Sequence, residues 1–206
     1  SHNLFFRIYN PQPFRDIMKE IGPSDVDSDS IDLWVVSHGG VASNAICDFL
    51  QKNGLRTRPD NYGLICHKQH PGSSLNVPIL VIYGDFEGAI KSMDRRGYLT
   101  ANATKMRFGM DLPEISLKRL IETRPRDPMG IIEFVNSFKS AQEKGVDNIE
   151  FLRYPYSNQD AVNKLQNLGF EIDFDGFSLR ERKKKFGIVS RDVKEILSAY
   201  KDTVFT

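Results

Sequence analysis

Three strand-like runs, two of them almost wholly apolar, are each followed by a loop and then by helical spacing, and they most constrain how this chain folds. They are Leu33–Val36, Val77–Gly84 and Ile149–Tyr154. Such runs are typical of strands buried on both faces, because the helices that connect parallel strands cover both sides of the sheet. The pattern predicts an α/β fold with a central parallel sheet in three α/β/α layers. We expect Leu33–Val36 and Val77–Tyr83 to be neighbouring strands.

Helical spacing of apolar residues between and after these runs predicts the helices. They are expected at Ala45–Lys52, between Gly84 and Gly97, at Glu114–Glu122, at Met129–Lys144 and at Gln159–Leu168. Leu64–His67 is expected to be a short strand. We expect one domain over residues 1–206, with a core at about 31–170 and with residues 178–206 forming a lid and a C-terminal helix.

The composition bears on partners and location. Lys plus Arg number 28 and Asp plus Glu 27, which gives a formal net charge of +1. Because no global charge attracts polyanions, we expect neither a nucleic-acid nor a membrane partner. No export signal and no apolar run of membrane-spanning length is apparent, so a cytoplasmic protein is expected. Cys47 and Cys66 are expected to be two buried thiols rather than a disulfide.

The segment Ser37–Asn44, SHGGVASN, lies where a ligand is expected. It joins the first strand to the first helix, at the sheet edge where open α/β folds bind ligands. Glycines let the backbone approach a ligand closely, and a helix N-terminus offers unpaired amides to an anion. The sequence predicts a phosphate site here, with an ordinary tight turn as the structural alternative. We expect a β-branched residue at Gly40 to abolish binding and to preserve the fold.

Two common phosphate loops do not match this segment. The nucleoside-triphosphatase loop, G-x-x-x-x-G-K-[ST], needs a lysine before its hydroxyl residue, and no lysine follows these glycines. The dinucleotide loop, G-x-G-x-x-G, needs a third glycine that Gly39-Gly40 lacks. The loop is therefore of another type.

Four segments instead resemble the sulfotransferases that use 3′-phosphoadenosine 5′-phosphosulfate (PAPS). In chain order they are SHGGVASNAICDFL, ICHKQHP, VPILVIYGDFEGAIKSMDRRGY and FLRYPYSNQDAVNKLQNLGF. The resemblance runs from about Leu33 to Phe170, and Thr100–Glu143 is not matched in detail. It implies the P-loop-like sulfotransferase fold, PAPS as the sulfuryl donor, no metal, and a small molecule or a glycan as acceptor.

The resemblance also implies roles for individual residues. The first segment is similar to the family's 5′-phosphosulfate loop, so the donor would be bound by Gly39, Gly40, Val41, Ala42, Ser43 and Asn44. His38 stands where the family has a lysine or arginine, and if protonated it would stabilise the leaving phosphate. Lys68 and His70 match the family's Lys-Thr-His, which makes His70 the general base for the acceptor hydroxyl.

The third segment is similar to the family's 3′-phosphate segment, with Ser92 in the expected place. Gly84 stands where the family has an arginine, so another cation is needed. On the helix only Arg95 shares the face of Ser92. The basic run Arg180–Lys185, which includes Arg182, resembles the family's lid. We expect Arg95 or a residue of this run to contact the 3′-phosphate.

Other interpretations stay open. The chain is alternatively a phosphotransferase with a degenerate loop, or a non-catalytic nucleotide binder. His38, His70 and Ser92 would then be packing or loop residues, and Arg180–Lys185 a solvated surface. His67 and His70 supply too few ligands for a metal site. Neither the acceptor nor the oligomeric state follows from these residues.

Overall fold

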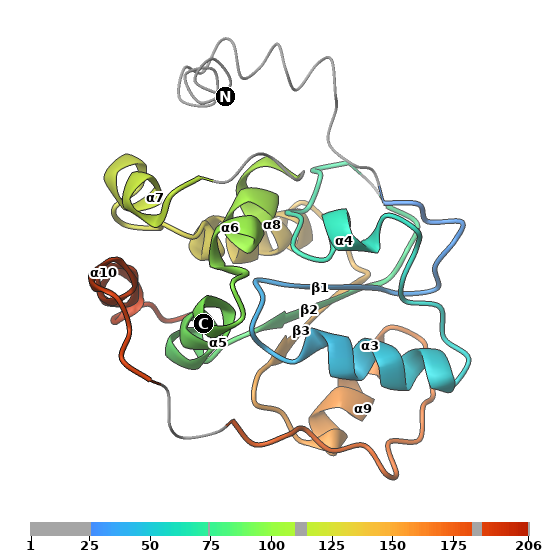
Figure 1. Ribbon diagram of the computed structural model, residues 1–206. Helices are drawn as coiled ribbons and strands as arrows, with labels where there is room; N and C mark the ends of the chain where they lie inside the picture. The colour runs from blue at the N-terminus through green and yellow to red at the C-terminus, as the bar shows by residue number, and fades with distance from the viewer. Residues whose placement is uncertain (1–25, 74, 110–114, 183–186, 206) are drawn as a thin grey trace.

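A three-stranded parallel sheet lies at the centre of the protein (Figure 1). The computed structural model describes residues 26–73, 75–109, 115–182 and 187–205. The strands are β1 (Trp34–Ser37), β2 (Ile79–Tyr83) and β3 (Ile149–Arg153), in the order β1-β2-β3. Trp34 pairs with Ile79, which pairs with Ile149 on its other side. The expected pairing of the first two strands is confirmed.

Helices connect these strands and cover them. They are α3 (Ser43–Lys52), α4 (Tyr62–Ile65), α5 (Phe86–Arg95), α6 (Leu99–Phe108), α7 (Leu117–Thr123), α8 (Ile131–Glu143), α9 (Asn158–Asn167) and α10 (Arg191–Tyr200). Figure 1 shows α3 and α9 on one side of the sheet and α6 and α8 on the other. The described chain is therefore α/β, and its arrangement is compatible with the three expected layers.

The side chains of the strands alternate between two hydrophobic clusters, one on each face of the sheet. Leu80 and Ile82 of β2 belong to the cluster that contains the apolar residues of α3 and α9. Ile79 and Val81 belong to the cluster that contains those of α6, α8 and α10. Because both faces of the sheet are covered at β1 and β2, these two strands are nearly continuous apolar runs, which is why the sequence locates them. The edge strand β3 is only partly buried and carries Glu150 and Arg153.

The expected connecting helices are present, with small shifts at their ends. The helix expected at Glu114–Glu122 is α7, and Glu114 itself lies outside the described residues. The helix α9 begins with a capping box, in which Ser157 accepts from the amide of Asp160 and the Asp160 carboxylate accepts from the amide of Ser157. Such local signals mark a helix start without help from the rest of the fold.

Two segments differ from the expectation. Leu64–His67 is not a strand, because it forms the end of α4 and the turn that follows. A run this short fits a strand or a helical turn equally well, and of these residues Ile65 alone is buried. The sequence also does not predict α6, because the buried residues of this helix include the polar Asn102 and Thr104. These interrupt the apolar spacing.

A buried tyrosine ties the C-terminal helix α10 to the start of α8. The Tyr200 hydroxyl donates to the Asp127 carboxylate at 2.6 Å and accepts from the amide of Met129 at 2.8 Å. The same carboxylate accepts from the amides of Ile132 and Glu133 in the first turn of α8. The network satisfies buried polar groups of two elements that are distant in the sequence.

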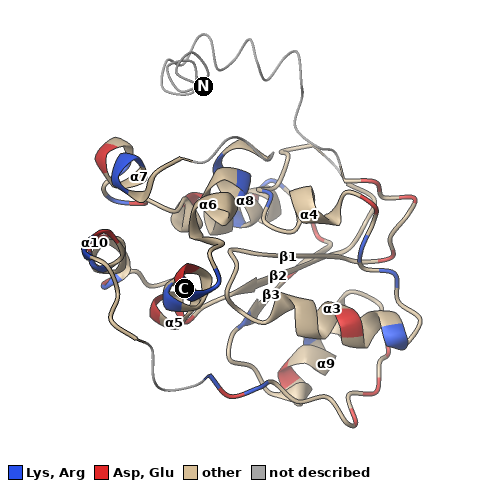
Figure 2. Cartoon of the chain, in the orientation of Figure 1, with Lys and Arg blue, Asp and Glu red and all other residues tan. Residues whose placement is uncertain are grey.

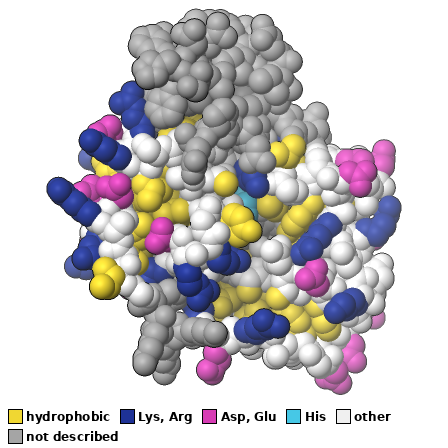
Figure 3. Space-filling model, in the orientation of Figure 1, with side chains coloured by type: hydrophobic (Ala, Val, Ile, Leu, Met, Phe, Trp, Pro, Cys, Tyr) yellow, Lys and Arg dark blue, Asp and Glu magenta, His cyan; other side chains and the backbone are white. Residues whose placement is uncertain are grey.

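Charges of both signs are mixed over the helices and loops (Figure 2). Figure 3 shows the same mixture on one face, where Lys and Arg side chains lie beside hydrophobic and acidic ones. Any attraction of an anion is therefore local. Within the described ranges no helix is both long and apolar enough to cross a membrane. Neither Cys47 nor Cys66 is part of a disulfide, as expected, and Cys47 is buried, but Cys66 is only partly buried and so departs from the expectation.

Candidate functional site

The loop after β1 leads into a helix whose N-terminus is open. Gly39, Gly40 and Ala42 have φ angles of 94°, 69° and 57°, so the chain turns through the left-handed region. Ala42 is the N-cap of α3 and supplies no side-chain hydrogen bond, and the first turn of this fully described helix holds no acidic residue. The first amides of α3 and the positive end of its dipole are therefore offered to an anion.

Both glycines of this loop lie against neighbouring helices. A Cβ at Gly40 would lie 2.5 Å from the carbonyl oxygen of Ala89 and 2.7 Å from its Cα, in α5. A Cβ at Gly39 would meet the side chains of Asn102 and Met93. Backbone atoms of a helix cannot give way as a flexible side chain does. The packing therefore contradicts the expectation that a β-branched residue at Gly40 preserves the fold.

A cavity of about 300 Å³ opens beside this loop, at the carboxyl end of β1. It is lined by Gly39, Gly40, Ala42, Ser43, Asn44, Tyr62, Gly63, Cys66, His67, Arg96, Tyr98, Asn102 and Lys105. Of the predicted loop residues Val41 is absent from this lining, because its side chain is fully buried in the core. The lining holds the cations Arg96 and Lys105 and, among these described residues, no acidic side chain, so it favours an anion.

His67 lines the cavity with a fixed tautomer. Its Nδ1 lies 2.6 Å from the carbonyl oxygen of Ser37. Because a carbonyl oxygen only accepts, Nδ1 carries the proton and Nε2 carries the lone pair. Burial, together with the nearby positive charges of Lys105 and Arg96, lowers the pKa of His67 to about 4. The ring is therefore neutral near pH 7, with a basic nitrogen left over for a proton.

His38 does not have the expected positive charge. Its ring is fully buried, Nε2 accepts from the amide of Gly84 at 3.1 Å, and Phe86 packs at 5.3 Å between ring centroids. Burial, together with the positive charge of a protonated His67 nearby, lowers the pKa of His38 to about 3. The neutral ring joins the loop after β1 to the loop after β2, and this is a structural role.

The structure places Lys68 and His70 outside the cavity lining. The amide of His70 donates to Ser137 Oγ at 2.9 Å, and its ring packs edge-on against Phe138 at 5.6 Å, both in α8. The pKa of His70 is lowered by burial. Lys68 is only 6% exposed. The histidine that the fold brings to the loop is His67, three positions earlier in the sequence.

The segment expected to hold a 3′-phosphate is arranged differently from the expectation. Gly84 has a φ of 119°, and a Cβ there would lie 2.6 Å from the carbonyl oxygen of Tyr154, so no arginine fits at this position. Ser92 and the exposed Arg95 are not among the residues that line the cavity. Arg96 lines it instead, with Nε donating to the carbonyl of Ser92 at 3.3 Å.

Arg182 folds back onto the loop after β1, but it contacts the backbone of that loop and does not line the cavity. Its two Nη atoms donate to the carbonyls of Gly40 at 2.6 Å and Gly88 at 2.8 Å. Its Nε forms an ion pair with Asp85 at 2.7 Å, and the guanidinium lies 4.8 Å from the centre of the Tyr154 ring. Through these contacts Arg182 links the loop after β1 to the loop after β2. Residues 183–186 of the basic run lie outside the described residues.

Sequence reasoning missed most of the side chains that complete the cavity. His67 lies within the ICHKQHP segment, but the match to the family's Lys-Thr-His favoured His70 instead. Arg96 follows the last residue of α5, where the chain leaves the helix and the 3.6-residue spacing no longer applies. Asn102 and Lys105 come from α6, which the sequence does not predict.

No family model matches the chain, and comparisons with curated proteins and with solved structures found no match. In the part of the chain that the structure describes, no group of three or more His, Cys, Asp or Glu residues is placed to hold a metal ion. The candidate site therefore rests on its own geometry: an open helix N-terminus, two cations, and a neutral histidine with a known tautomer.

Proposed function

We propose that this chain is a sulfotransferase of the P-loop-like fold, which moves a sulfuryl group from PAPS to a hydroxyl or amine of a small molecule or glycan. The observation that carries the proposal is the cationic cavity at the open N-terminus of α3, with His67 in its wall. The site offers a phosphosulfate group what it needs, which is backbone amides and fixed positive charge.

The donor would be held by the loop and by the cations beside it. The amides of Gly40, Ser43 and Asn44 suit the oxygens of the 5′-phosphate and the sulfate. Arg96 adds a guanidinium that no carboxylate of the described residues pairs with, and its Nε hydrogen bond to α5 fixes its stem. Arg182 supports the loop from the carbonyl side of Gly40. These contacts would orient the donor and balance its charge.

The transfer needs a base for the proton of the acceptor. Nε2 of His67 has a free lone pair, because Nδ1–H is bound to the carbonyl of Ser37. As the acceptor oxygen or nitrogen forms its bond to sulfur, the bond from sulfur to the phosphate oxygen breaks, and Nε2 takes the acceptor proton. A bound anion favours the protonated ring and raises its pKa, which makes His67 a stronger base once the donor is present.

Calorimetric titration tests the donor site. Wild-type protein is expected to bind adenosine 3′,5′-bisphosphate more tightly than adenosine 5′-phosphate. Arg96→Gln should weaken the bisphosphate about ten- to a hundredfold, because charge-assisted hydrogen bonds contribute about 1.5–3 kcal/mol. Arg95→Gln is the matched control, since it removes the same charge one residue away and outside the cavity. The proposal fails if the wild type shows no preference for the bisphosphate.

Sulfate transfer from labelled PAPS to a panel of phenols, amines and glycans tests the base. His67→Gln keeps a side chain of similar length but removes the basic nitrogen, so kcat should fall about a hundred- to ten-thousandfold. His70→Gln should leave kcat within a few-fold of wild type, because the structure places that ring against α8. A large fall in kcat for His70→Gln with little change for His67→Gln would instead identify His70 as the base.

A non-catalytic nucleotide binder is the second candidate. Gly84 admits no side chain and His38 is neutral, so the two positions at which the family carries cations supply none here. Wild-type protein that binds the bisphosphate yet transfers no sulfate to any acceptor of the panel would favour this candidate. A requirement for magnesium together with phosphate transfer would instead favour a phosphotransferase.

A further inference from the structure

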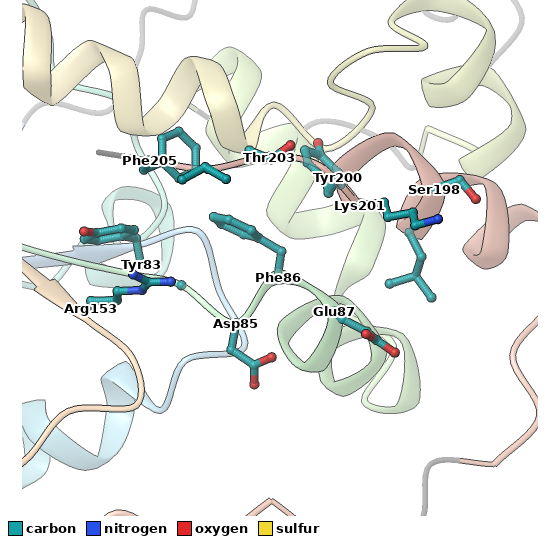
Figure 4. A pocket seen from close by; sticks show the side chains of 13 residues that line it. Tyr83, Asp85, Phe86, Glu87, Arg153, Ser198, Tyr200, Lys201, Thr203 and Phe205 are labelled. Carbon is teal, nitrogen blue, oxygen red and sulfur yellow. The ribbon is translucent and has the colours of Figure 1, made fainter.

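A second and larger cavity, of about 540 Å³, lies at the carboxyl ends of β2 and β3 (Figure 4). It is lined by Tyr83, Gly84, Asp85, Phe86, Glu87, Arg153, Leu197, Ser198, Tyr200, Lys201, Thr203, Val204 and Phe205. None of these residues lines the cavity beside α3. Small-molecule sites are typically about 300–1,000 Å³ and lie at this edge of a parallel sheet. The proposed sulfotransferase function does not use this cavity.

Aromatic rings make up the apolar wall of the cavity. Phe205 packs edge-on against Phe86 at 5.2 Å and against Tyr83 at 6.0 Å between ring centroids. Figure 4 shows these three side chains grouped at one end, with Arg153 alongside Tyr83. Tyr83 and Arg153 are paired across β2 and β3, so the sheet itself fixes their spacing. A planar ring of a ligand would extend this aromatic group by stacking.

The charges of the lining favour a negative ligand. Both carboxylates already have cationic partners, since Asp85 pairs with Arg182 at 2.7 Å and Glu87 with Lys91 at 2.5 Å. No acidic group of the described residues pairs with Arg153, an exposed arginine whose stem lies against Gly84. Arg153 is thus a cation beside an aromatic wall, in a lining whose acidic groups are neutralised.

From this combination we infer that the cavity binds a planar aromatic anion, a ring system carrying a carboxylate, sulfonate or phosphate. The ring lies on Tyr83, Phe86 and Phe205, and the anionic group pairs with the Arg153 guanidinium. A neutral aromatic molecule would stack on the aromatic wall but would form no ion pair with Arg153. An aliphatic anion would form the ion pair but would not stack on the wall. The site is selective because it needs both features of the ligand.

Naphthalene-2-sulfonate and naphthalene-2-sulfonamide test this inference, because they share the ring system and differ in charge. Calorimetry on the full chain is expected to show the sulfonate binding about tenfold more tightly, as suits a partly exposed charge-assisted contact. Arg153→Gln should remove this difference and leave the sulfonamide within about twofold of its wild-type affinity. Phe205→Leu should weaken both probes several-fold, since it removes a stacking surface.

Arg180→Gln is the matched control, because Arg180 is an exposed arginine outside the lining, and this variant should bind both probes as the wild type does. Equal binding of the two probes, or an unchanged preference in Arg153→Gln, would overturn the inference. The titration is repeated with saturating adenosine 3′,5′-bisphosphate. Unchanged sulfonate binding is expected, and competition would overturn the inference by making the cavity part of the donor site. Failure of the bisphosphate to bind would count against the proposed function alone.

Discussion

The replacement of Gly40 by alanine measures how tightly the loop after β1 is packed. A Cβ at this position would lie 2.5 Å from the Ala89 carbonyl oxygen and 2.7 Å from the Ala89 Cα. Gly40 also has a φ of 69°, which L-residues rarely adopt. Two separate costs therefore fall on one substitution, and a suitable control separates them. Gly97 has nearly the same φ, 74°, and a Cβ there would have nothing within 4 Å.

The expected magnitudes follow from these two terms. Placing alanine in the left-handed region costs about 1–2 kcal/mol, and this applies equally to Gly40→Ala and Gly97→Ala. Overpacking against well-placed atoms costs about a further 1–3 kcal/mol, and this applies to Gly40→Ala alone. We therefore expect Gly40→Ala to lower the free energy of unfolding by about 2–5 kcal/mol, and Gly97→Ala by about 1–2 kcal/mol.

Urea unfolding followed by the fluorescence of Trp34 measures both values. This is the one tryptophan of the chain and it is fully buried, so its emission reports the loss of the core. Equal m-values in the two variants are needed for a direct comparison of stabilities. If Gly40→Ala is no less stable than Gly97→Ala, α5 does not pack on the loop as described. In that case a Gly40 variant that stays folded but loses anion binding would be direct evidence that the anion binds at this loop.

Three further predictions concern stability. The lowered pKa values of His38, about 3, and His67, about 4, mean that the unfolded chain takes up their protons first. The two neutral rings thus contribute fully to the free energy of unfolding above about pH 6.5. This contribution is lost as the pH falls, by about 1 kcal/mol per histidine between about pH 6.5 and 5.5. Urea unfolding at several pH values should show that the free energy of unfolding of His38→Gln falls less steeply with decreasing pH than that of the wild type. The same dependence on pH in both proteins would refute this. Tyr200→Phe should cost about 1–3 kcal/mol, because it leaves buried partners of the hydroxyl unsatisfied. A change below about 0.5 kcal/mol in the same assay would show that the hydroxyl is dispensable. Arg182→Gln should cost about 1–3 kcal/mol by thermal or urea unfolding, whereas the exposed Arg180→Gln should stay within about 0.5 kcal/mol. Equal losses of stability in the two variants would mean that the contacts of Arg182 do not stabilise the loop.

The strands and most helices could be predicted because their signals are local. A strand buried on both faces is apolar at every position, as Val35 and Val36 are, whatever lies against it. A capping box such as that of Ser157 lies within one turn of chain. The position of the loop at the carboxyl end of β1 follows from the parallel sheet alone.

The side chains of the candidate site could not be predicted in the same way. The sequence placed a histidine near the loop, but spacing could not distinguish His67 from His70, since both follow α4 without a regular repeat. The resemblance put His38 where the family has a cation, but a sequence does not show that a ring will be fully buried with its acceptor nitrogen bound to the amide of Gly84. Burial disfavours the charged form, and burial is a property of the fold.

What the sequence by itself determined is the α/β class, the pairing of β1 with β2, and the glycine loop at their carboxyl edge, because each is encoded in contiguous residues. Only the tertiary structure decided what surrounds that loop. Arg96 comes from the end of α5 and Lys105 from α6, and they meet the loop only when the helices pack on the sheet. Arg182 reaches the carbonyl of Gly40 from 142 positions away in the sequence. A binding site assembled from such distant segments has no sequence pattern of its own, because its geometry is set by packing rather than by neighbours along the chain.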